Sequence, residues 1–134
     1  MNQKDIISRY PQLFARYYLP MTQTCMCWGI QTGKGWFPII DDLCGKIQKL
    51  IDEKLIQTIE FECIKEKYGS LRIITYKYCK EVDVLIKLAV CKASVTCEEC
   101  SKHIIYNQDS TSDDSNEKMD NYYYNKLCDD CKQI

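Results

Sequence analysis

Two segments of the chain carry apolar residues at the spacing of a buried helical face. In residues 38–56 these residues recur every three or four positions with polar residues between them, and Pro38 fits the first turn of a helix. The apolar positions are Ile40, Leu43, Cys44, Ile47, Leu50, Ile51 and Leu55. The same spacing recurs in residues 81–94, at Val82, Leu85, Ile86, Ala89, Val90 and Ala93. The pattern therefore predicts amphipathic helices over residues 38–56 and 81–94.

Between these helices the apolar residues follow a period of two. Ile59, Phe61 and Cys63 alternate with glutamates, which is typical of a half-buried strand. The following run, LRIITYKY, is rich in β-branched and aromatic residues, and Gly69 lies in the turn between the two runs. We therefore predict a β-hairpin over residues 58–78.

The segment that precedes these elements is less regular. Short helical segments are expected before Pro11 and before Pro20, because a proline disfavours helical backbone at the residue that precedes it. A long loop follows over residues 21–36, with three of the five glycines of the chain. Together the elements predict an α+β fold, with a small helix/β-hairpin domain over residues 1–94 and a zinc-ribbon-like C-terminal module over residues 95–134.

The composition is that of a small globular domain. Of 134 residues, 46% are hydrophobic and 28% are charged, and the net charge of -1 gives no overall attraction to nucleic acid. No stretch of 18 apolar residues and no signal-peptide core are present, so we expect a cytoplasmic protein without membrane contact. Residues 107–121 carry five acidic residues and one lysine, and we expect this acidic insert to be mobile.

Ten cysteines in a chain that is expected to stay reduced indicate metal binding. Cys97 and Cys100 form one CxxC pair, Cys128 and Cys131 form another, and 27 residues separate the pairs. Two such pairs place four thiolates around one tetrahedral Zn²⁺, and a complete Cys₄ sphere leaves no position for water or substrate. We therefore predict one structural zinc ion. His103, three residues after Cys100, is an alternative ligand.

The remaining cysteines allow a second hypothesis. Cys25 and Cys27 form a CxC pair, and Cys44 lies on the first predicted helix, so a second metal site would lack only a fourth ligand. The candidates for that ligand are Cys63, Cys79 and Cys91. These three lie on predicted apolar faces, where a thiol behaves as a small hydrophobic group. We therefore favour buried thiols over a second zinc site.

The glycine-rich loop resembles a phosphate-binding loop only in part. In the string GIQTGKG, glycines flank Lys34 just ahead of the first long helix. A P-loop needs four residues between its glycines and a Ser or Thr after the lysine, and this string has neither. We expect the glycines to form positive-φ turns and the aromatic residues to anchor the loop on the core. Trp28, Lys34 and Trp36 remain candidates for a contact surface.

The predicted hairpin is basic and aromatic. The segment IKEKYGSLR places Lys65, Lys67 and Arg72 near the turn, together with Tyr68. Such a surface can hold phosphates and stack bases. The alternative is a solvated hairpin on which neighbouring glutamates of the same strand neutralise the lysines.

The sequence contains no convincing catalytic constellation. His103 is the only histidine, which removes most Ser–His and Cys–His arrangements. Asp41 and Asp42 are adjacent on a predicted helix, so they point in different directions and do not form a carboxylate pair. We therefore expect a protein that is not an enzyme.

Two segments resemble a family of small uncharacterised proteins of phages, prophages and bacteria. They are CWGIQTGKGWFPIIDDLC and KEKYGSLR, and the C-terminal CxxC pairs correspond to the zinc knuckles of that family. The matching positions are Trp28, Gly29, Gly33, Gly35, Trp36, Asp41, Leu43 and Cys44 in the first segment, and Lys65, Glu66, Lys67, Tyr68, Gly69, Leu71 and Arg72 in the second. The resemblance covers most of the chain. Where this chain has Lys34 the family often has an acidic residue, which argues against a required phosphate-binding lysine.

The resemblance implies no known activity, but it does imply a phage or mobile-element setting. Small non-enzymatic proteins in that setting commonly bind and neutralise host factors, an inference by association rather than from physics. The expected function is therefore a zinc-stabilised accessory protein that inhibits a host factor, such as an immune protein or its nucleotide signal. The alternative is a zinc-ribbon protein that binds nucleic acid.

Overall fold

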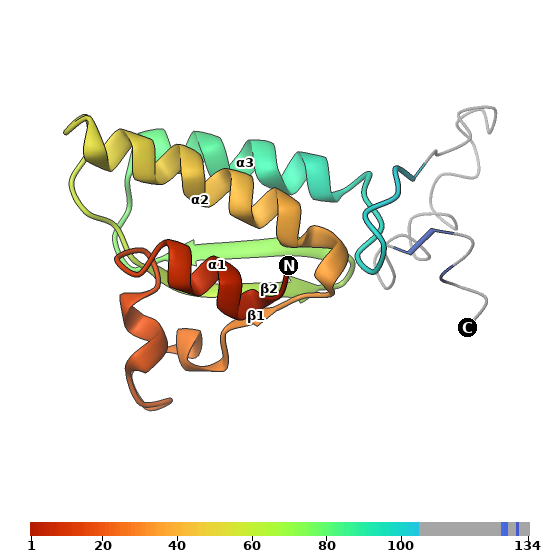
Figure 1. Cartoon of the computed structure of the whole chain (residues 1–134), viewed down its shortest axis with the longest axis horizontal. Helices are drawn as coiled ribbons and strands as arrows, with labels where there is room; N and C mark the ends of the chain where they lie inside the picture. The colour runs from red at the N-terminus through yellow and green to blue at the C-terminus, as the bar shows by residue number, and fades with distance from the viewer. Residues whose placement is uncertain (105–126, 129–130, 132–134) are drawn as a thin grey trace.

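The computed structural model describes residues 1–104, 127–128 and 131, and it confirms the α+β fold class (Figure 1). Its helices are α1 (Gln3–Arg9), α2 (Phe37–Asp52) and α3 (Lys80–Ala93), and its strands are β1 (Ile30–Gln31), β2 (Phe61–Lys67) and β3 (Ser70–Thr75). Short 3-10 helices form at η1 (Ala15–Tyr18), η2 (Cys25–Trp28) and η3 (Lys34–Trp36). Figure 1 shows α2 and α3 side by side above the sheet. No helix in the described ranges is both long enough and apolar enough to cross a membrane.

The sheet has the order β1–β2–β3 and combines a parallel with an antiparallel pair. β2 and β3 form the predicted hairpin, in which Lys67 pairs with Ser70 and only Tyr68 and Gly69 make the turn. Both turn residues have positive φ, 54° and 77°, as a type I′ turn requires. β1, which runs parallel to β2, was not predicted, because its two residues are too few for a period-two pattern.

The two faces of the sheet differ in character. Ile64 of β2 is fully buried, and its partner Ile73 on β3 packs against the same core. The largest fully buried side chains of this core are Trp36, Phe14, Phe61, Ile6, Leu13, Met26, Ile40, Ile47, Ile64, Leu71, Val82 and Cys44. Because side chains alternate along a strand, Lys65 and its partner Arg72 lie on the opposite face. We call this opposite face of β2 and β3 the outer face.

The helix boundaries differ from the predictions at one end. The prediction of a helix over residues 38–56 is too long, because α2 ends at Asp52. Lys54 has a φ of 59°, which a continuing helix does not allow, and Leu55 is 64% exposed rather than part of the buried face. The second predicted helix, over residues 81–94, agrees with α3 to within one residue at each end.

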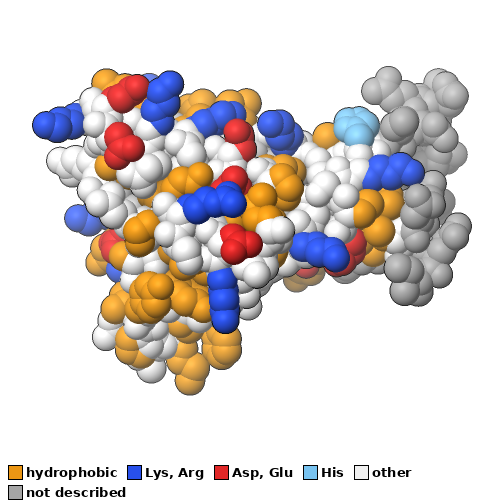
Figure 2. Space-filling model, in the orientation of Figure 1, with side chains coloured by type: hydrophobic (Ala, Val, Ile, Leu, Met, Phe, Trp, Pro, Cys, Tyr) orange, Lys and Arg blue, Asp and Glu red, His pale blue; other side chains and the backbone are white. Residues whose placement is uncertain are grey.

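Residues 15–28, with η1 and η2, form a small lobe beside the sheet that we call the 3-10 lobe. Arg16 holds it in place: its Nε lies 2.8 Å from the Glu62 carboxylate, and its guanidinium lies 4.0 Å from the centre of the Tyr76 ring. The large side chains that the lobe exposes are Tyr18, Met21 and Trp28. Figure 2 shows hydrophobic side chains gathered over this lobe, at the lower left.

Only part of the C-terminal module is described. Residues 95–104 turn back on themselves just after α3, with Thr96 and His103 forming an antiparallel bridge. The acidic insert predicted at residues 107–121 lies outside the described residues. The described part of the module therefore comprises this turn and the positions of its four cysteines.

Candidate metal centre

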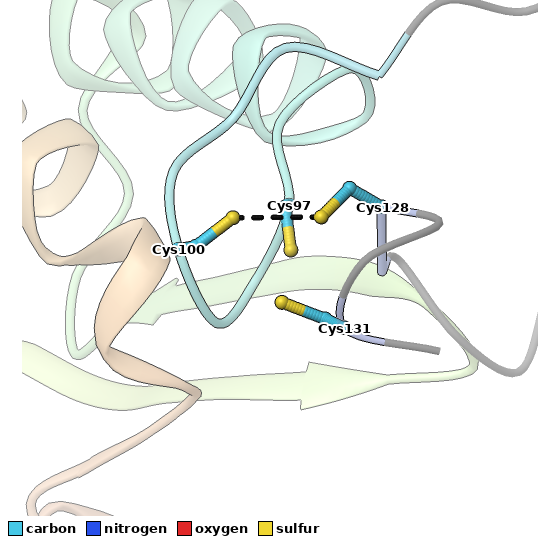
Figure 3. Close-up of side chains that lie close together, drawn as sticks. All are labelled: Cys97, Cys100, Cys128 and Cys131. Atoms are coloured by element: carbon cyan, nitrogen blue, oxygen red, sulfur yellow. Dashed lines mark hydrogen bonds between the residues drawn. The ribbon is translucent and has the colours of Figure 1, made fainter. Parts of the chain in front are cut away.

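The four cysteines that were predicted as metal ligands converge on one point (Figure 3). The sulfur atoms of Cys97, Cys100, Cys128 and Cys131 all lie within 4.8 Å of one another, and the Cys100 and Cys128 sulfurs are 3.5 Å apart. Four sulfurs at the usual Zn–S distance of about 2.3 Å form a tetrahedron with edges of about 3.8 Å. The arrangement is therefore compact enough for all four sulfurs to hold a single ion.

Local backbone geometry positions the first CxxC pair. The N–H of Ser101 donates to the carbonyl of Cys97 at 3.1 Å, and the N–H of Cys97 donates to the carbonyl of Lys102 at 2.7 Å. Ser101 has a φ of 70°, which lets the chain reverse directly after Cys100. In the second pair, the N–H of Cys131 donates to the carbonyl of Cys128 at 3.1 Å.

The electrostatics of the cluster favour a bound cation. Burial raises the pKa of Cys97, but backbone N–H groups of Cys128, Cys100 and Glu99 outweigh it and lower that pKa to about 6. The pKa of Cys131 is instead raised, chiefly by the adjacent Cys128 thiol and by burial. The Cys97 thiol thus loses its proton readily while the Cys131 thiol keeps its proton, because negative sulfurs this close repel each other. A divalent cation removes that repulsion and stabilises all four thiolates.

The cluster fits a closed structural site better than a catalytic one. Four thiolates complete a tetrahedral sphere, so no open position remains for water or substrate. The donor set is also soft, which suits zinc or an iron–sulfur centre and not magnesium or calcium. The side chain of His103, the alternative ligand, is exposed, and it is not among the side chains that cluster in the described residues.

The glycine-rich loop lies directly on the first CxxC turn. The N–H of Gly33 donates to Glu98 Oε2 at 2.7 Å, and the N–H of Gly35 donates to the backbone carbonyl of Glu98. In return the Ser101 hydroxyl donates to the carbonyl of Gly35 at 2.6 Å. Trp36, the next residue, donates its indole N–H to the carbonyl of Thr96 at 2.9 Å. The loop and the metal-binding turn therefore form one hydrogen-bonded unit.

This contact explains why the loop contains glycines. A Cβ atom on Gly35 would lie 2.3 Å from the carbonyl oxygen of Cys97, and one on Gly33 would lie 2.6 Å from that of Glu98. Both positions therefore require glycine for close backbone approach. The expected positive φ occurs at Gly29, at 73°, whereas Gly33 has an ordinary φ of -68°.

The same contacts argue against the phosphate-loop alternative. Both glycine N–H groups that could face a phosphate already donate to Glu98. Burial raises the pKa of Glu98, and the Glu66 and Glu99 carboxylates raise it further, so the region is not one that attracts an anion. The expectation that aromatic residues anchor the loop is confirmed at Trp36, whose side chain is fully buried. That burial also corrects the prediction of Trp36 as a contact residue.

The hypothesis of a second metal site gains no support from the described residues. Cys25 is exposed, Cys27 is half-buried and Cys44 is buried, and within the described ranges only the C-terminal four cysteines cluster as ligands. Burial raises the pKa of Cys44, and the Asp41 carboxylate raises it further, so this thiol stays protonated in the core.

The remaining candidate contact residues lie at the surface. Trp28 is 59% exposed on the 3-10 lobe, and Lys34 is exposed on the glycine-rich loop. Lys67 and Arg72 are exposed on the hairpin, Lys65 is half-buried, and Tyr68 is 54% exposed at the turn. No protein-family model, curated protein or solved structure matches the chain.

Proposed function

We propose that the chain is a non-enzymatic, zinc-stabilised protein that binds and inhibits a host factor. The observation that carries the proposal is the docking of the glycine-rich loop on the Cys97–Cys100 turn. This docking favours a structural role for the metal, because a bound ion would fix the turn that the loop contacts. Zinc is the ion that four thiolates in a closed tetrahedron favour.

The proposed contact surface consists of exposed and half-buried residues on the sheet and beside it. They are Trp28, Lys34, Lys65, Lys67, Tyr68 and Arg72. Aromatic and arginine side chains are the types that most often dominate binding free energy at interfaces. Trp36 is left out of this surface, because its side chain is part of the core.

We base the choice of partner on the family resemblance. The resemblance to phage and prophage proteins favours a host immune protein, or the nucleotide signal that such a protein uses, as the inhibited factor. In that setting the protein would act in the host cytoplasm as a counter-defence factor.

An affinity pull-down from a bacterial lysate tests this function. The bait is the zinc-loaded full chain, and bound proteins and nucleotides are both identified by mass spectrometry. A matched bait carries Trp28→Ala and Lys34→Ala, which change exposed side chains and leave the metal centre intact. A factor that binds the first bait, is lost with the second and loses activity on binding supports the proposal. Equal capture by both baits contradicts it.

The second candidate function is nucleic-acid binding, which the cations of the outer face favour. Binding to phosphates weakens steeply as salt concentration rises, whereas binding to an apolar protein surface does not. A salt titration of the captured complex therefore separates the two candidates.

A further inference from the structure

Three cations line the outer face of the β2–β3 hairpin. Lys65 and Arg72 are direct cross-strand partners, and Lys67 follows two positions after Lys65 on the same side of β2. Side chains of directly opposed residues lie about 5 Å apart, where like charges destabilise a sheet. A sheet that keeps such a pair without a neutralising group is suited to an anionic ligand.

The nearby glutamates do not neutralise these cations. The Glu62 carboxylate contacts Arg16 at 2.8 Å, and Glu66 accepts a hydrogen bond of 2.7 Å from the N–H of Gly69. In residues 1–104, 127–128 and 131, neither Lys65 nor Arg72 forms an ion pair or a side-chain hydrogen bond. In the described residues, the carboxylates of Glu62 and Glu66 are therefore engaged with groups other than Lys65.

Aromatic rings lie at both ends of this row of cations. Tyr68 is at the hairpin turn and is 54% exposed, with the Lys67 ammonium 5.6 Å from its ring centre. At the other end, Tyr76 directly follows β3 and is also 54% exposed, with the Arg16 guanidinium 4.0 Å from its ring centre. The backbone N–H of Tyr76 donates to the backbone carbonyl of Glu60 at 2.9 Å, which keeps this part of the chain beside the residue that precedes β2.

We propose that the outer face binds the phosphates of a nucleotide ligand through Lys65, Lys67 and Arg72, with bases stacking on Tyr68 and Tyr76. Arginine holds phosphate through a planar fork of donors, and tyrosine rings stack on bases without regard to sequence. A ligand that alternates phosphates with flat rings matches this face better than an acidic peptide does. A single-stranded nucleic acid and a small nucleotide signal share that chemistry. The inference rests on the proposed function only in locating the contact surface on the hairpin.

The test measures binding of two probes to the zinc-loaded full chain. One probe is a labelled oligothymidylate and the other is a labelled cyclic dinucleotide, each titrated at several salt concentrations. The test variant is Lys65→Gln with Arg72→Gln. The matched control is Lys49→Gln with Lys92→Gln, which removes the same charge from exposed positions on α2 and α3.

Binding of either probe is expected to weaken about tenfold or more in the test variant and to stay unchanged in the control. For the oligonucleotide, the logarithm of the association constant should fall against that of salt with a slope of about -2 for three phosphate contacts. Binding of the oligonucleotide alone assigns a nucleic-acid strand as the ligand, and binding of the dinucleotide alone assigns a small nucleotide.

A second variant separates loss of the ring from loss of the fold. Tyr68→Asn removes the ring but keeps a residue that tolerates the positive φ of a type I′ turn. It should weaken probe binding without lowering the melting temperature. The Lys65→Gln, Arg72→Gln variant should melt no lower than the wild type, because it removes a like-charge pair.

Two outcomes overturn the inference: neither probe binds, or the control variant weakens binding as much as the test variant does. If neither probe binds while a host protein is captured by the wild type and lost in the test variant, the outer face docks a protein. The proposed function then stands without the nucleotide site. If a probe binds but no host factor is inhibited, the nucleotide site stands and the proposed function fails.

Discussion

The indole N–H of Trp36 donates a hydrogen bond of 2.9 Å to the backbone carbonyl of Thr96, across 60 positions of the chain. Trp36 immediately precedes α2, and Thr96 immediately precedes the first metal-binding cysteine. The bond therefore joins the hydrophobic core to the metal centre. A substitution at Trp36 should therefore affect the metal centre, and a change at the metal centre should affect the packing of Trp36.

Gly35→Ala should destabilise the protein and weaken its affinity for zinc. The new Cβ would lie 2.3 Å from the carbonyl oxygen of Cys97, so the loop or the turn must move, at a cost of about 1–3 kcal/mol. Chemical denaturation and competition with a chromophoric chelator measure the two effects.

Gly45→Ala is the matched control for that substitution. A Cβ at this position on α2 would lie 3.4 Å from the Tyr10 hydroxyl, which is close to an ordinary contact. Alanine also favours helix over glycine by about 1 kcal/mol. The control should therefore be neutral or stabilising, with unchanged zinc affinity. If both alanine variants behaved alike, the close approach of the loop would have no energetic importance.

Trp36→Phe should lower the free energy of unfolding by about 1–3 kcal/mol, because it leaves the Thr96 carbonyl without its donor. Trp28→Phe changes an exposed ring and should have almost no effect. Urea denaturation of the two variants measures the difference. An equal loss of stability in both would show that the buried hydrogen bond contributes nothing.

Metal analysis should find about one zinc ion per chain. Cys100→Ser should abolish stoichiometric binding, whereas Cys91→Ser, which changes an exposed thiol outside the cluster, should retain it. In a Trp28→Phe background, chelation should also shift the Trp36 fluorescence to longer wavelength, because its anchoring turn loosens. A folded, metal-free protein whose thiols all react freely would contradict the zinc site.

The protons that zinc displaces should depend on pH. The pKa of Cys97 is lowered to about 6, so above that pH this residue is already a thiolate and releases no proton when zinc binds. Below pH 6 it must release one, so zinc binding should displace about one proton more. Calorimetry in buffers of different ionisation enthalpy counts these protons, and an equal number on both sides of pH 6 would exclude the lowered pKa.

The same pKa fixes how the metal-free protein responds to pH. The folded-state pKa of Cys97 lies below its usual value of 9.0, so its contribution to stability is present above pH 9 and is lost as the pH falls through 6. Thermal unfolding of the metal-free chain should therefore occur at lower temperature at the acid end of this range. Cys97→Ser should flatten that dependence.

The sequence was sufficient for features that depend on local periodicity or spacing. The amphipathic helices, the hairpin and the convergence of the two CxxC pairs all follow from such patterns, and each lies close to its prediction. The end of α2 was missed because Leu55 continues the apolar period although Lys54 leaves the helical region. A hydrophobic pattern does not record a change in backbone conformation.

Features that depend on contacts between distant segments could not be predicted. Two glycines around a lysine suggest a phosphate loop as readily as a close backbone approach, and only the position of Glu98 distinguishes the two. Trp36 is likewise an aromatic residue in a polar loop, which suggests a surface position until its partner Thr96 is known. The acids that flank Lys65 were also ambiguous, because their partners Arg16 and Gly69 could not be identified from spacing.

The docking of the loop on the metal-binding turn sets an order for folding during synthesis. Gly33 leaves the ribosome 65 residues before Glu98, its partner. At about 5–20 residues per second, the loop waits roughly 3–13 s for that partner. During this interval the Trp36 indole lacks the Thr96 carbonyl to which it donates, and the nascent chain exposes an apolar side chain that a chaperone can bind. Folding of the first third of the chain is therefore completed only after the first pair of cysteines has been made.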